Sequence, residues 1–85
     1  MRVYASVHTH NKIIKKYTSS SDNPDVSRAF LECSEKIYKA LDLSEPIWLS
    51  KHQRELSRFH RVRFRAEDFL EPISFDWIEL EIIDD

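Results

Sequence analysis

The sequence predicts a single α+β domain in which an antiparallel sheet, formed by an N-terminal hairpin and a C-terminal strand, carries one long and one shorter helix packed on one face. Near both ends of the chain, apolar and polar residues alternate, which is typical of strands with one buried face. In the middle of the chain, apolar residues recur at spacings of three and four, which is typical of helices. A parallel sheet would instead need regular alternation of strands and helices, with strands buried on both faces.

The length and the apolar content limit the chain to one hydrophobic core. Leu, Ile, Val and Phe supply 24 of the 85 residues, which is enough for the chain to fold. A chain of this size has no room for a second core, so we expect residues 1–85 to form one domain. Charged residues make up 33% of the sequence, which predicts a modest core and a surface dense in both signs of charge.

The N-terminal part of the chain predicts a hairpin followed by a loop. Residues 2–8 alternate between apolar and polar side chains and form the first expected strand, and the β-prone residues 13–18 form the second. Between them, His10 and Asn11 can adopt the positive φ angles of a tight turn in a chain that contains no glycine. Residues 19–23 are expected to form the loop.

The next segment predicts the long helix. Asn23 provides a side-chain cap, and Pro24 is suited to the first helical position. The helix is expected to end near Asp42, because Pro46 cannot continue it. Apolar residues recur at helical spacings at Val26, Phe30, Cys33, Ile37 and Leu41.

The second half of the chain predicts the shorter helix and two further strands. Ser50 and Gln53 match a capping box that would begin this helix. Leu56 and Phe59 are its apolar positions, and they form one narrow stripe, so the helix should lie on the surface. The segments that follow are a short strand at residues 61–65, one helical turn at residues 66–70 and the C-terminal strand at residues 77–83.

Five short motifs stand out in this second half: Asp42–Ser44, Pro46–Leu49, Arg63–Phe64, Asp68–Phe69 and Phe75–Glu79. Together they resemble a family of small uncharacterised cytosolic proteins of anaerobic Gram-positive bacteria. That family has no assigned activity. The resemblance therefore implies a bacterial cytoplasmic protein, and it carries over no catalytic or binding residue.

Positive charge is concentrated between Lys51 and Arg65, where six Lys or Arg residues accompany one acid, Glu55. In a helix of 3.6 residues per turn, the first four of these cations would share one stripe that faces solvent. The sequence therefore favours a small non-enzymatic protein-interaction module that binds an acidic surface of a partner protein through this basic face. The basic face consists of Lys51, Arg54, Arg58, Arg61, Arg63 and Arg65.

Two other interpretations of this charge remain open. Residues 66–85 hold eight acids and no Lys or Arg, so they would neutralise the basic face if the fold places them beside it. The same cations would also hold nucleic-acid phosphates without reading bases. The net charge of −2 and the core-like spacing of Phe59 and Phe64 make the nucleic-acid interpretation the weaker one.

A small metal site is a further alternative, because His8 and His10 could place two imidazoles on one face of a strand. A zinc or iron centre needs at least a third ligand, which His52, His60 or an acid could supply, but no spacing in the chain points to one. His10 is also the expected turn residue. The sequence therefore predicts neither a bound metal nor another cofactor.

Other features argue against an enzyme. Without glycine, the chain cannot form a phosphate-binding loop, a dinucleotide-binding turn or a hydrolase nucleophile elbow. Cys33 is expected to be a buried, inert thiol on the apolar side of the long helix. Glu79 and Glu81 share one face of the C-terminal strand, where we expect ion pairs with Lys15 or Lys16 of the hairpin rather than acid–base catalysis.

The expected location of the protein is the cytoplasm. The chain has no basic-then-apolar leader and no long apolar run, which predicts that it makes no contact with a membrane. Its single cysteine cannot form an internal disulfide, as is usual in a reducing compartment.

Overall fold

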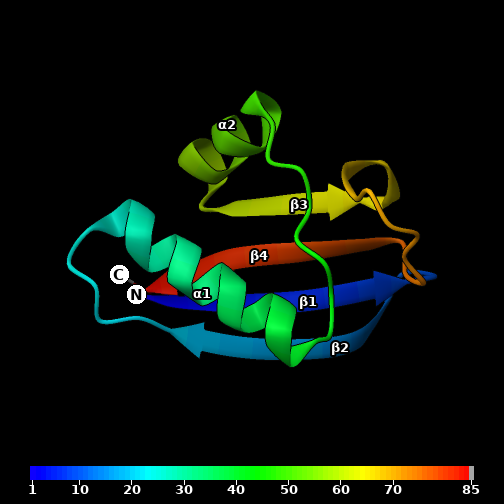
Figure 1. Cartoon of the computed structure of the whole chain (residues 1–85), viewed down its shortest axis with the longest axis horizontal. Coiled ribbons are helices and arrows are strands. Elements are labelled where there is room, and N and C mark those ends of the chain that lie inside the picture. Colours follow the sequence, from blue (N-terminus) through cyan, green and yellow to red (C-terminus); the bar gives the residue numbers. More distant parts are fainter. Residues whose placement is uncertain (85) are drawn as a thin grey trace.

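The computed structural model describes residues 1–84 and confirms the predicted α+β class. In this part of the chain, four antiparallel strands form one sheet in the order β2-β1-β4-β3, and two α-helices lie on one face of it (Figure 1). The start of β1 is paired with the end of β4, so the two ends of the chain meet at one end of the sheet. The elements are β1 (Arg2–Thr9), β2 (Lys12–Ser20), α1 (Val26–Ala40), α2 (Ser50–Phe59), β3 (Arg61–Arg65), the 3-10 turn η1 (Ala66–Asp68) and β4 (Trp77–Asp84).

The hairpin forms as predicted, although its second strand is longer than expected. His10 and Asn11 occupy the turn with φ angles of 52° and 64°, in the left-handed region that these residue types enter more readily than most. Strand β2 includes Ser19 and Ser20, because both are still paired with β1. The expectation that the loop begins at residue 19 is therefore wrong by two residues.

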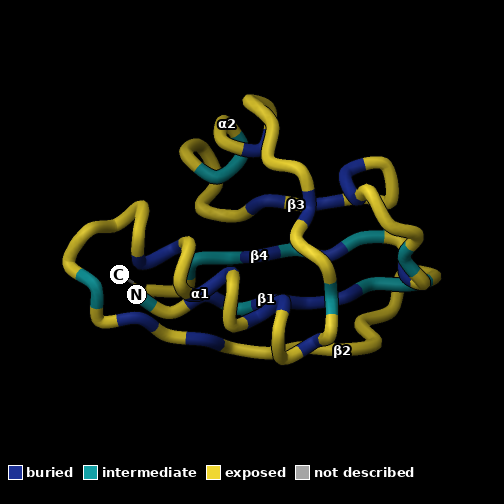
Figure 2. Tube along the Cα trace, viewed as in Figure 1, coloured by how far each residue is buried: buried dark blue, intermediate teal, exposed yellow. Residues whose placement is uncertain are grey.

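Strand β4 lies between β1 and β3, which brings apolar residues of three strands onto one face of the sheet. Val7 of β1 and Phe64 of β3 are both paired with Ile78 of β4, and all three are almost completely buried. Figure 2 shows buried positions along β1, β3 and β4, whereas β2 is almost entirely exposed. The core therefore lies over β1, β4 and β3, under the two helices.

Helix α1 begins two residues later than the sequence predicts. Asp25 is the N-cap, and its carboxylate accepts a hydrogen bond from the Arg28 N–H at 3.1 Å. The Asn23 side chain instead accepts a hydrogen bond from the Asp25 N–H at 2.9 Å, so Asn23 supports the turn before the helix. The helix ends at Ala40, close to the predicted end, and Asp42 follows with a φ of 55°.

Helix α2 has a different cap from the predicted one. Leu49 is the N-cap residue, and its N–H donates to Nδ1 of His52 at 3.0 Å. The predicted capping box is therefore wrong, because Ser50 is already helical and the His52 ring occupies the place expected for Gln53. The helix ends where His60 adopts a left-handed conformation with a φ of 58°.

The two helices cover different parts of the sheet. Helix α1 packs against β1 and β2, whereas α2 packs against β3. The segment 41–49 crosses the face of the sheet from one helix to the other (Figure 1). Because the helices lie over different strands, they pack little against each other, and this spacing shapes the surface described next.

Candidate functional site

The six cations of the basic face divide between two elements. Lys51, Arg54 and Arg58 lie on α2, and the remaining three lie on β3. The prediction that Arg61 continues the helical stripe is wrong, because the left-handed conformation of His60 ends the helix and Arg61 begins the strand. The two groups of cations therefore have different surroundings.

The arginines of β3 lie on the sheet face that the helices leave open, because the residues between them point into the core. On that face, a carboxylate oxygen of Glu79 lies 3.0 Å from Nε of Arg63 and 3.8 Å from Nε of Arg61. The Arg63 guanidinium also lies over the Trp77 ring, 5.2 Å from its centroid. Two cations of the basic face are thus paired with the acidic C-terminal segment.

The expected ion pairs between Glu79 or Glu81 and the hairpin lysines are wrong. They required β4 to lie next to the lysine-bearing strand, but β1 lies between β4 and β2. Glu79 faces Ser6 on one side and a β3 arginine on the other. Lys15 and Lys16 therefore lie one strand further from β4 than the predicted ion pairs require.

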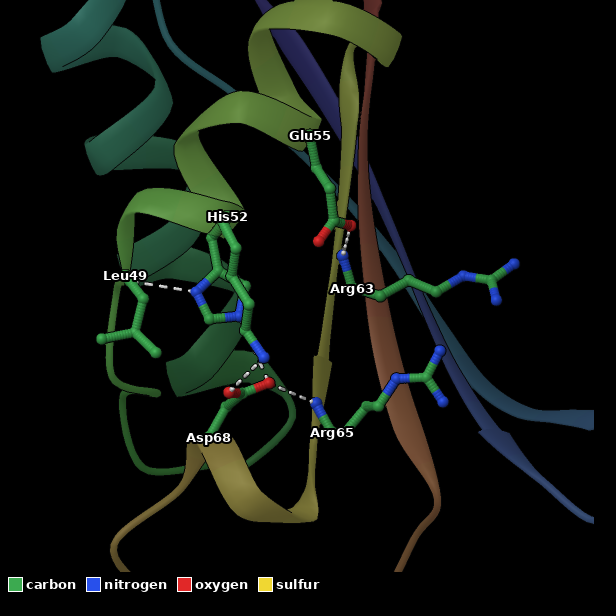
Figure 3. A network of polar contacts seen from close by, with 7 residues as sticks. Leu49, His52, Glu55, Arg63, Arg65 and Asp68 are labelled. Carbon is green, nitrogen blue, oxygen red and sulfur yellow. Dashed lines mark hydrogen bonds and ion pairs between the residues drawn. The ribbon is translucent and has the colours of Figure 1, made fainter.

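Lys51 contacts a buried carboxylate. Its Nζ lies 3.6 Å from Asp68 of η1, which also accepts a hydrogen bond from the Arg65 N–H at 2.9 Å and lies 3.2 Å from Nε2 of His52 (Figure 3). Burial by itself raises the pKa of the Asp68 carboxyl, but these three partners outweigh burial and lower that pKa below its ordinary value. Asp68 is therefore held as a carboxylate beneath α2.

His52 links α2 to the segments on either side of it. It is fully buried, and its ring lies 4.6 Å from the ring of Phe64. Because Nδ1 accepts the Leu49 N–H, the neutral ring carries its proton on Nε2, the atom nearest to Asp68. Both partners are enclosed in the core, so the pair fixes the position of α2 and is closed to a substrate.

Two carboxylates close the outer edge of β3. Glu55 of α2 accepts the Arg63 N–H at 3.4 Å, and Asp68 accepts the Arg65 N–H (Figure 3). These amides point away from β4, as alternate amides of an edge strand do. The same contacts therefore hold α2 against the sheet and occupy two outward donors of β3.

Arg54 and Arg58, called the arginine pair below, have no such partners. Both are exposed on α2, and within residues 1–84 neither forms an ion pair with a carboxylate. They are four residues apart and so lie on one side of the helix, where two like charges destabilise a helix by about 0.2–0.5 kcal/mol. The described part of the fold does not offset this cost.

An open groove of about 450 Å³ separates α1 from α2, and we call it the interhelical groove. Trp48 contributes to it: its ring is 6.0 Å from Phe30 and 5.5 Å from Phe64, yet the residue is 42% exposed. The apolar lining consists of Val26, Phe30, Leu31, Trp48, Leu56 and Ile82.

The groove and the arginine pair are adjacent. Gln53 and Ser57 line the groove, and the same two residues border the shallow depression that Arg54 and Arg58 line on the outer side of α2. The groove and the arginine pair therefore share a border along Gln53 and Ser57.

Neither the groove nor the burial of His52 was predicted from the sequence. The groove depends on how two helices far apart in sequence lie on the sheet, so no local pattern predicts it. His52 did have a signal: it precedes Leu56 by four residues and so shares its helix face, which is the face that packs on β3.

The remaining candidates from the sequence have separate surroundings. His8 lies on the open face of the sheet, where Nε2 is 2.8 Å from Oγ of Ser6 and the ring stacks on Trp77 at a centroid distance of 4.9 Å. His10 lies in the turn, and Cys33 is fully buried in the core. Among residues 1–84, no three His, Cys, Asp or Glu side chains are grouped so that they could hold a metal ion.

No protein-family model, curated protein or solved structure matches this chain. In the described part of the chain, no helix is long and apolar enough to cross a membrane. Geometry and charge are therefore the basis for inferring a function.

Proposed function

We propose that this chain is a non-enzymatic protein-interaction module that binds an acidic surface of a partner protein through the arginine pair. The observation that carries the proposal is that Arg54 and Arg58 are exposed, one helical turn apart and without an ion-pair partner among residues 1–84. The other cations support it less, because Lys51, Arg61 and Arg63 are each paired with a carboxylate of the chain itself.

The position of the arginine pair is fixed before any partner arrives. Helix α2 is fastened at its first turn by His52 and Asp68 and in its middle by Glu55, all three of which face β3 or η1. The backbone of an anchored helix loses little conformational freedom on binding, so the entropy cost is confined to the two arginine side chains.

The strength of such a contact is limited. An exposed ion pair contributes about 0.2–1 kcal/mol and is screened by salt. Two arginines alone would therefore give a weak, salt-sensitive complex, and stable binding needs further contacts close to the arginine pair. On the basis of the sequence resemblance, the proposal also places the protein in the cytoplasm of a bacterium.

The test compares two double charge reversals, R54E/R58E on α2 and K15E/K16E on β2, which change the net charge equally. Tagged versions of both variants and of the wild type capture partners from a bacterial lysate, and the captured protein is then produced in pure form and titrated by calorimetry. We expect K15E/K16E to bind like the wild type and R54E/R58E to bind at least about tenfold more weakly. Equal binding by R54E/R58E, with its circular dichroism spectrum unchanged, would remove the proposal.

Contact with nucleic-acid phosphates is the second candidate, since Arg65 forms no ion pair among residues 1–84 and lies on the open sheet face. It has less support, because Glu79 pairs with two of the three arginines on that face and would repel a phosphate backbone. Fluorescence anisotropy with mixed DNA and RNA oligonucleotides at low ionic strength checks it. Binding that weakens with added salt, and that R65E abolishes, would favour this candidate over the first.

A further inference from the structure

We infer that the segment bound by this module is an acidic amphipathic α-helix that places its apolar side in the interhelical groove and its carboxylates against the arginine pair. This inference rests on the proposed function and adds to it the shape and chemistry of the partner.

The groove leaves apolar side chains uncovered. Val26 is 62% exposed, Leu31 is 55% exposed and Trp48 is 42% exposed, and all three line the same depression. Single exposed apolar residues are ordinary on a protein surface, but a group of them around a hollow with polar surroundings is typical of an interaction site. An occupant with an apolar side would remove this surface from water.

The surroundings of the groove favour a helical occupant over an extended one. The floor includes Ile82 of β4, and β4 is paired with β1 on one side and β3 on the other, so it offers no free edge to an added strand. An extended segment in an apolar groove would bury backbone N–H and C=O groups without partners. A helix satisfies these groups internally and can present a purely apolar stripe.

The dimensions of the groove set the length of that stripe. On the α2 side, the lining residues run from Gln53 to His60, the residue that ends the helix, which corresponds to about 10 Å along the helix axis at 1.5 Å per residue. On α1, they run from Val26 to Leu31. Walls of this length accommodate about two turns of a bound helix, with apolar residues at positions i, i+4 and i+7.

The charge next to the groove favours an acidic occupant. Gln53 and Ser57 line both the groove and the depression of the arginine pair, and the side chain of Ser57 is short. A carboxylate on the flank of the bound helix would then pair with Arg54 or Arg58. The like charges of α2 that the fold leaves uncompensated would be neutralised in the complex.

The experiment uses a labelled synthetic helical peptide with leucines at i, i+4 and i+7 and glutamates on both flanks, titrated into the full chain by fluorescence anisotropy. Three control peptides separate the parts of the inference: one with the same composition and a scrambled stripe, one with lysine in place of glutamate, and one with a central proline. We expect the first peptide to bind at least about tenfold more tightly than each control. Equal binding of the lysine or proline peptide overturns the acidic or the helical part of the inference, and lack of binding by the first peptide overturns the whole.

Protein variants distinguish this inference from the proposed function. Leu31 is exposed, so L31E should leave the fold intact. It should weaken the binding of the first peptide as strongly as R54E/R58E does. If R54E/R58E weakens binding and L31E does not, the arginine pair binds acidic groups but the partner helix does not bind in the groove. If neither variant has an effect, both ideas fail. Sedimentation of the chain alone tests a second copy as occupant, since a self-association that L31E abolishes would contradict a partner helix.

Discussion

The two edge strands of the sheet are protected by different means. At β3, the carboxylates of Glu55 and Asp68 accept outward N–H groups, so two donors are already occupied. At β2, almost every residue is exposed (Figure 2), and protection comes from Lys15 and Lys16 and from the register shift opposite them. Occupied donors resist an added strand at any ionic strength, whereas repulsion between lysines is screened by salt.

The difference also links the β3 edge to the candidate binding surface. Glu55 belongs to α2, so the residue that closes this edge also holds the helix that carries the arginine pair. Helix α1 is held differently, by apolar residues such as Cys33 and Ile37 that are fully buried against the sheet. Helix α1 thus combines apolar burial with a hydrogen bond from Ser19 Oγ to the Cys33 carbonyl at 2.9 Å, whereas α2 buries His52 and relies more on polar contacts.

The largest expected effect on stability comes from removing Asp68, the buried carboxylate that accepts an outward N–H of β3. Asp68→Ala removes the carboxylate 3.2 Å from the buried His52 Nε2 and the acceptor of the Arg65 N–H, whereas the exposed Lys51 ammonium remains hydrated. Each unsatisfied buried polar group costs about 1–3 kcal/mol, so we expect the free energy of unfolding to fall by about 3 kcal/mol in urea titrations. Glu67→Ala, at the exposed neighbouring carboxylate, is the matched control and should change stability by less than about 0.5 kcal/mol. A loss no larger than that of the control would show that the network does not hold α2.

The pH dependence of stability sharpens the same point. The pKa of Asp68 is lower in the folded chain than its ordinary value of 3.8, so its stabilising effect is complete well above that value and is lost as the pH falls through the folded pKa. The difference in unfolding free energy between the wild type and Asp68→Asn should therefore be constant near neutral pH and shrink below about pH 4. A difference that grows on acidification would contradict the charge assignment.

Glu55→Ala should have a smaller effect on stability and a clear effect on the edge. It frees the Arg63 N–H, which accounts for one long hydrogen bond, so we expect a loss of about 0.5–1.5 kcal/mol. Hydrogen exchange followed by NMR should show faster exchange at the Arg63 amide, while the Arg65 amide, bonded to Asp68, should keep its protection. If the two amides exchange equally fast in the variant, Glu55 does not close the edge by itself.

The smallest effect on stability is expected at the other edge. The double substitution K15T/K16T removes exposed charge from β2 and should alter the unfolding free energy by less than about 0.5 kcal/mol. Its consequence should be association: sedimentation at low salt should show more self-association than in the wild type, and added salt should bring the wild type closer to the variant. If the wild type and the variant sediment alike at both salt concentrations, repulsion between the lysines does not protect β2.

Local patterns determined most of the secondary structure. The hairpin turn at His10 and Asn11, the long helix and the short strand at residues 61–65 were predicted because each depends on residues close together in sequence. The predicted N-terminal caps of both helices were wrong, because the side chains of Asp25 and His52 make the capping hydrogen bonds in place of the expected residues. Capping depends on which of several nearby polar side chains the surrounding packing orients toward the helix end.

The sequence alone determined the α+β class and the placement of Arg54 and Arg58 on one side of a surface helix, because helical periodicity fixes which residues share a face. Only the tertiary structure decided that Glu79 pairs with arginines, that His52 is buried and that a groove lies between the helices. These features depend on the strand order and on the strands beneath each helix. Such contacts join residues far apart along the chain, and their choice depends on the free energy of packing the whole domain rather than on any local pattern.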